Sequence, residues 1–167
     1  MKVALIVIFL LFVGYLWYDY SKETAAAASG PPVIENPWYA EIRTSSPIPG
    51  TSREIEMALF VRTKSERECS LGSQREWGNL MEDCPTCSSV APKCARELSP
   101  RYARLFEDAP IPSAYLSATA AAPRERDMRL VIYGLTDDEG VRVCELLRTQ
   151  LEKNYTGASQ CIAPSRG

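Results

Sequence analysis

The sequence contains no histidine among its 167 residues. Histidine is the commonest general base near neutral pH and the commonest metal ligand in proteins. Its absence excludes Ser-His-Asp and Cys-His catalysis within this chain, together with zinc sites that use imidazole. No other catalytic constellation is apparent, so the sequence does not indicate an enzyme, and it predicts no cofactor and no metal site.

An excess of basic side chains is also missing, because 19 Lys and Arg residues stand against 21 Asp and Glu residues for a net charge of -2. A chain without basic excess cannot neutralise many phosphates, which argues against a nucleic-acid partner. The sequence shows neither common glycine-rich phosphate loop and no internal repeat. Apolar residues make up 46% of the chain, enough for a packed core.

Charged residues are absent from one stretch near the N-terminus, Val3 to Tyr18. A spanning helix usually needs about 20 apolar residues, with about 17 near the lower limit. We predict a transmembrane anchor at residues 1–20 that contacts the membrane through residues 3–18. Lys2 favours an N-in orientation in an inner (plasma) membrane, with the rest of the chain in the periplasm or extracellular space. The alternative is a signal peptide cleaved near Ala28.

Residues 21–52 are rich in Pro, Ala and Ser and read as an extended linker. Within this linker, Tyr39 to Thr44 is compatible with one short strand. Trp38 and Tyr39 either pack on the following domain or contact a partner, and packing is the commoner fate of such aromatic side chains.

Residues 53–167 are predicted to form an extracytoplasmic α+β domain. In residues 53–63, Ile55, Met57 and Leu59 alternate with polar side chains, as in a strand with one buried face. Further strands are predicted at 114–121, 128–134 and 157–164. One helix is predicted from a Ser73–Glu76 capping box to Pro85, and an earlier turn from Ser65 through Cys69 is compatible with an extension at its N-terminal side. A second helix is predicted from Thr136–Glu139 to about residue 154.

Residues 87–113 look irregular and are interpreted as an insertion that carries a brief helix. The resulting β-α-β-β-α-β order is that of a ferredoxin-like fold, an antiparallel four-stranded sheet with two helices on one face. This topology is common to many functions and therefore does not indicate one.

Six cysteines follow the apolar segment, and an even number in an oxidising space predicts disulfides. The predicted topology brings Cys144 of the last helix close to Cys161 of the last strand, so we expect these two to be bonded. For the remaining four, we expect Cys84 with Cys94 and Cys69 with Cys87.

Cys84-Pro85-Thr86-Cys87 resembles the active-site dithiol of thioredoxin-like oxidoreductases. Those dithiols begin a helix, whose N-terminal dipole lowers the thiol pKa. Here the motif follows a predicted helix, which favours a structural role over a redox pair of Cys84 and Cys87. A zinc site built from the first four cysteines would need them reduced, which the predicted compartment disfavours.

Three functions remain open at this point. The first is a membrane-tethered interaction or accessory module, a small subunit or assembly factor of an envelope complex, with a protein partner in the membrane or periplasm. The second is an envelope thiol-disulfide oxidoreductase that uses Cys84 and Cys87. The third is a secreted ligand-binding domain, released by signal cleavage, that uses an open sheet face with Tyr115, Thr119 and Tyr133 as lining residues.

Overall fold

The computed structural model describes residues 33–48, 50–83, 87–123 and 125–165. The predicted anchor at residues 1–20 and the cleavage site near Ala28 lie outside these ranges. None of the helices in the described ranges is long and apolar enough to cross a membrane.

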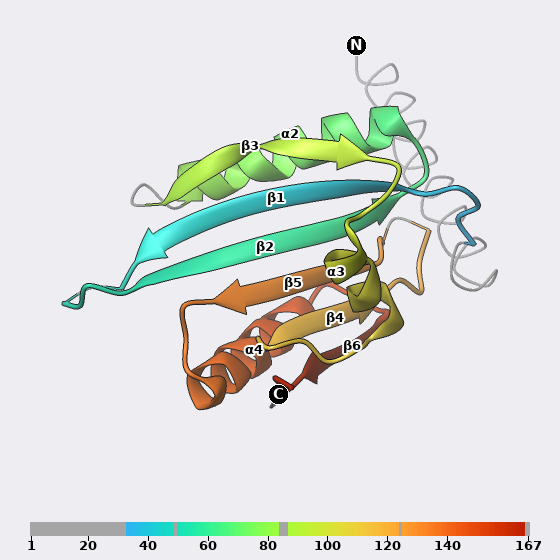
Figure 1. Cartoon of the computed structure of the whole chain (residues 1–167). Coiled ribbons are helices and arrows are strands. Elements are labelled where there is room, and N and C mark those ends of the chain that lie inside the picture. Colours follow the sequence, from blue (N-terminus) through green and yellow to red (C-terminus); the bar gives the residue numbers. More distant parts are fainter. Residues whose placement is uncertain (1–32, 49, 84–86, 124, 166–167) are drawn as a thin grey trace, which may run out of the picture.

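Six antiparallel strands form one sheet in the order β3-β1-β2-β5-β4-β6 (Figure 1). The strands are β1 (Trp38–Pro47), β2 (Glu54–Thr63), β3 (Ser88–Ala95), β4 (Tyr115–Thr119), β5 (Met128–Tyr133) and β6 (Ala158–Ile162). The helices are α2 (Glu66–Asp83), α3 (Pro100–Ala103) and α4 (Asp137–Leu151), and a 3-10 helix, η1 (Arg104–Glu107), follows α3 directly.

The α+β class and the antiparallel sheet are confirmed, whereas the four-stranded ferredoxin-like arrangement is wrong. In that fold the last strand lies beside the first, but here β1 occupies the place next to β2 and β6 pairs with β4 instead. Strand β1 lies within the predicted linker at 21–52 and includes the short strand expected at Tyr39 to Thr44, while β3 lies within the predicted insertion at 87–113. These two strands extend the sheet beyond the four predicted strands.

The sheet divides into two halves with the same chain course. The first half is β1-β2-α2-β3 and the second is β4-β5-α4-β6. In each half the last strand pairs with the first and forms a sheet edge, and the halves meet where β2 pairs with β5. The two helices share an Arg-x-Cys-x-Leu pattern, at residues 67–71 and 142–146. The fold therefore contains an internal duplication, although the sequence analysis found no repeat.

Both long helices cover one face of the sheet. Cys144 of α4 is fully buried against Leu116 and Ile132, and the predicted Thr136–Glu139 capping box is present at the start of this helix. Helix α2 begins at Glu66, so it includes the N-terminal extension expected from Ser65 through Cys69, and the predicted cap Ser73 lies inside the helix. The actual cap is Ser65, whose hydroxyl accepts a hydrogen bond from the Glu68 backbone N–H.

The opposite face is covered by the crossover, which we define as residues 96–114 between β3 and β4. Leu105 and Ile111 of the crossover are buried against Phe60 and Val131 of the sheet. The crossover buries Ala58 and Phe60 of β2 completely, while Ile55, Met57 and Leu59, which were predicted as the buried face of this strand, are half-buried. Phe60 breaks the alternation in the sequence because it faces the crossover.

Candidate functional site

A buried guanidinium fixes the crossover to the sheet. Arg129 of β5 is 3% exposed, and its Nε donates to the Leu105 carbonyl at 2.8 Å. Its Nη1 donates to the Ala118 carbonyl at 2.8 Å, and its Nη2 forms an ion pair with Asp108 at 3.2 Å. A buried charge is tolerated only when it is paired and hydrogen-bonded, and both conditions are met here by groups of the same chain.

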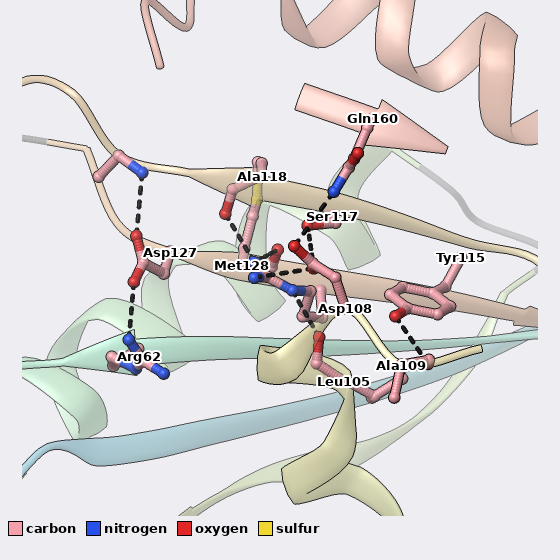
Figure 2. A network of polar contacts seen from close by, with 12 residues as sticks. Arg62, Leu105, Asp108, Ala109, Tyr115, Ser117, Ala118, Asp127, Met128 and Gln160 are labelled. Atoms are coloured by element: carbon pink, nitrogen blue, oxygen red, sulfur yellow. Dashed lines mark hydrogen bonds and ion pairs between the residues drawn. The ribbon is translucent and has the colours of Figure 1, made fainter. Parts of the chain in front are cut away.

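Asp108 is the second centre of this network (Figure 2). It ends η1 in the left-handed conformation, with a φ of 53°. One carboxylate oxygen accepts a hydrogen bond from the Ser117 hydroxyl at 2.6 Å, and the other accepts from the Gln160 amide at 3.1 Å. Burial lowers the pKa of Arg129, and the nearby Asp108 carboxylate opposes this shift. The network thus links the crossover to β4, β5 and β6, and its polar groups are occupied by one another.

Tyr115, Thr119 and Tyr133 were predicted to line an open, ligand-binding face of the sheet. The structure does not fit this prediction. Tyr115 is fully buried beneath the crossover, where its hydroxyl donates to the Ala109 carbonyl at 2.9 Å (Figure 2). This burial raises the pKa of Tyr115 to about 12. Thr119 is exposed at the end of β4, and Tyr133 is half-buried. The three side chains therefore do not form a common exposed surface.

A shallow groove of about 460 Å³ remains beside the crossover, where β2 begins and β5 ends. Arg43 lies on its wall and donates to Glu41, Glu56 and the Tyr102 hydroxyl, each at 2.6 Å. The Tyr133 hydroxyl is buried near the Tyr102 side chain, and burial together with this neighbour raises the pKa of Tyr133 to about 12. The groove is open and polar, and its strongest donor already has three partners.

Trp38 and Tyr39, the predicted partner-contact residues, stand at the start of β1 and are both half-buried. The Arg96 guanidinium lies over the Trp38 ring, 4.7 Å from its centroid. The Tyr39 ring meets the edge of Phe106 in the crossover, with centroids 5.3 Å apart. Both rings therefore pack on their own domain, and contact with a partner stays a prediction for their exposed portions.

Two disulfides occupy equivalent places in the two halves. Cys69 of α2 is bonded to Cys94 of β3, and Cys144 of α4 is bonded to Cys161 of β6. Each bond joins the long helix of one half to its edge strand. The Cys144–Cys161 pair is the one expected from the predicted topology.

The expected pairs Cys69–Cys87 and Cys84–Cys94 are wrong, because Cys69 is bonded to Cys94. Residues 88–95 are an edge strand that runs beneath α2, so this strand carries Cys94 to the first turn of the helix. A four-thiolate zinc site is incompatible with this bond, because two of its ligands are oxidised. In the described residues no group of three potential ligands could hold a metal ion.

Cys84, one member of the predicted redox pair, lies outside the described residues. Cys87 follows the C-terminal end of α2, is 9% exposed and is disulfide-bonded. A helix C-terminus disfavours a thiolate, whereas active dithiols stand at helix N-termini. The surroundings of Cys87 therefore resemble those of a structural cysteine.

Arg129 and Asp108 were not predicted from the sequence as organising residues. Arg129 does give a signal, because it lies on the same strand face as Val131 and Tyr133, where a charge is unexpected. Nothing in the sequence indicates the role of Asp108, because that role depends on how the crossover folds back onto β5. No family model, curated protein or solved structure matches this chain.

Proposed function

We propose that this chain is a membrane-tethered, extracytoplasmic interaction module that serves as a small subunit or assembly factor of an envelope complex. Residues 1–20 anchor it, and the disulfide-bonded domain contacts a protein partner in the membrane or periplasm. Catalysis has no part in this proposal.

The observation that carries the proposal is that the chain itself covers one face of its sheet with helices and the centre of the other face with the crossover. Arg129 and Asp108 are satisfied internally. Ligand sites are usually concave and largely apolar, with a few converging polar groups. The described grooves are shallow, so the outer surface and the sheet edges are the places left for recognition.

The disulfides support the extracytoplasmic location. Bonds such as Cys69–Cys94 and Cys144–Cys161 form and persist in oxidising compartments and are rare in the cytosol. An extracytoplasmic domain in turn needs an export signal, and Val3 to Tyr18 is the segment of this sequence that fits one.

Two experiments test the proposal. The first determines the mature N-terminus and the membrane association of the native protein. An intact N-terminus in the membrane fraction is expected, while a mature start at Ser29 would refute the anchor. The second purifies the full chain in mild detergent and identifies co-purifying proteins. A stoichiometric partner is expected, and a chain that purifies alone from every extract refutes the accessory role.

A control separates this proposal from the oxidoreductase alternative. Insulin reduction is measured for the wild type and for Cys84→Ser. We expect equal, background-level rates from the two proteins. A wild-type rate well above that of the variant would establish the redox alternative instead.

A further inference from the structure

The two edges of the sheet are strand β3 and strand β6, the last strands of the two duplicated halves. An edge strand presents unpaired N–H and C=O groups, which can pair with another chain. Soluble proteins usually block such edges with prolines, charged side chains or bulges. The two edges can therefore be compared directly, because they occupy equivalent positions.

The β3 edge carries three of these protective features. Pro92 has no N–H, Lys93 is charged, and the pairing with β1 shifts register between Glu41 and Arg43. This shift places an extra residue of β3 opposite Ile42, which is a bulge. A further strand would meet an irregular backbone at this edge.

The β6 edge carries none of them. Residues 157–163 contain no proline and no charged side chain. The pairing with β4 is regular from Tyr115–Ile162 to Thr119–Ala158. After β6 the chain turns toward the crossover, where the Ser165 N–H donates to the Ile111 carbonyl, so residues 163–165 do not extend β6. The strand is therefore regular and carries no charge of its own, and the carboxylates beside it, Glu152 and Asp108, accept hydrogen bonds from Ser159 and Gln160.

The sequence of β6 is also complementary to itself. In an antiparallel pair centred on Gln160, this residue faces its own copy, Ala158 faces Ile162, and Ser159 faces Cys161. Small side chains thus meet larger ones, and two amides that can hydrogen-bond to each other meet at the centre. None of these strand pairs brings two charged side chains opposite each other, and the nearest charge to the axis is Asp108, which accepts a hydrogen bond from Gln160 in each copy.

We propose that β6 pairs with β6 of a second copy of this chain, which joins two six-stranded sheets edge to edge about a two-fold axis at Gln160. The inference names one partner within the proposed interaction function and rests on it. Isologous contacts of this kind are the commonest basis of homodimers.

The test places like charges on the axis. In Gln160→Lys the new side chain keeps Asp108 as a neighbour within its own copy, but it meets a second lysine across the interface. Like charges directly opposite each other weaken strand pairing, and we expect the dissociation constant to rise by roughly threefold to tenfold. Val90→Lys adds the same charge at the other edge, at a position that is 59% exposed, and should leave the constant unchanged.

Two measurements on the full chain in non-ionic detergent give the result. Light scattering after size exclusion measures the dimer as a function of concentration. Amide hydrogen exchange of residues 158–162 reports whether β6 forms the interface. We expect these amides to be protected in the dimer and to lose protection in Gln160→Lys. An equimolar mixture of Gln160→Lys and Gln160→Glu should recover the dimer, because opposite charges then meet.

Three results would overturn the inference. One is a wild-type chain that stays monomeric at every concentration with unprotected β6 amides. Another is a dimer that Gln160→Lys does not weaken, which would locate association elsewhere, for instance in the N-terminal segment. The third is protection of β6 only when another protein co-purifies. Failure of the membrane anchor is detected separately by the mature N-terminus, and the dimer is measurable on either form.

Discussion

Replacing Arg129 with methionine tests whether the buried ion pair holds the crossover in place. Methionine fills a similar volume but removes the charge and every donor. The Leu105 and Ala118 carbonyls each lose a hydrogen bond of 2.8 Å from a charged group. Such bonds contribute about 1.5–3 kcal/mol each, and breaking a buried ion pair typically costs about 3–5 kcal/mol.

Asp108 limits the loss, because its side chain is 36% exposed and water can solvate it once Arg129 is gone. We therefore expect Arg129→Met to lower the free energy of unfolding by about 3–4 kcal/mol. Asp108→Asn is the matched variant, since it keeps the shape and leaves Arg129 with its carbonyl partners. In this variant the two carbonyl hydrogen bonds and the nearby Asp127 carboxylate still compensate the buried guanidinium, so we expect a smaller loss of about 1–2 kcal/mol.

The assay is urea unfolding of the full chain in detergent with the disulfides intact, followed by circular dichroism. Hydrogen exchange across residues 100–107 adds a local readout, because α3 and η1 should open before the rest of the domain in Arg129→Met. The ion pair does not hold the crossover if Arg129→Met lowers the free energy of unfolding by less than about 1 kcal/mol, or if both variants lower it equally.

The remaining predictions concern a turn, a disulfide and an ion pair. Gly134 has a φ of 82°, and a Cβ there would lie 2.0 Å from the Glu54 carbonyl oxygen, so Gly134→Ala should cost about 3 kcal/mol or more. Gly50→Ala, with a φ of 76° and open space around it, should cost only about 1 kcal/mol; equal losses in urea unfolding would contradict this account. Replacing both Cys144 and Cys161 by serine opens a bond across a sequence separation of 17, and thermal unfolding should show a loss of about 3 kcal/mol. Arg53 and the Thr136 cap lower the pKa of Glu139 to about 2, below its ordinary value of 4.5. This contribution to stability is present above pH 4.5 and is lost as the pH falls toward 2, so Glu139→Gln should flatten that part of the unfolding profile; an unchanged profile would exclude the contribution.

The parts of the fold predicted from the sequence are those with strong local signals. Strand β5 alternates regularly, and α4 has both a capping box and an apolar stripe, so their positions were close to those observed. The Cys144–Cys161 pair followed from the same local signals, because a helix and the next strand lie close together.

The missed elements depend on distant partners. Strand β1 was expected as a short strand at Tyr39 to Thr44, but its full length and its place in the sheet were not, because the face that it buries (Ala40, Ile42 and Thr44) is small and partly polar. Strand β3 contains Pro92, which argues against a strand unless that strand is at an edge. Without these strands the expected disulfides of the first half were wrong, and the duplication stayed hidden. The covered sheet face was missed for a related reason, since the crossover that buries Tyr115 has little regular structure.

The position of β1 in the sheet has a mechanical consequence. The chain passes from its N-terminal segment directly into β1, which is held by β2 over the ten residues from Trp38 to Pro47 and by β3 on its other side. Ladder hydrogen bonds lie perpendicular to the strands, so tension applied through the N-terminal segment acts on β1 in shear. The bonds must then fail together rather than unzip one by one. Under the proposed function, this geometry would let the domain bear load between its membrane anchor and its partner.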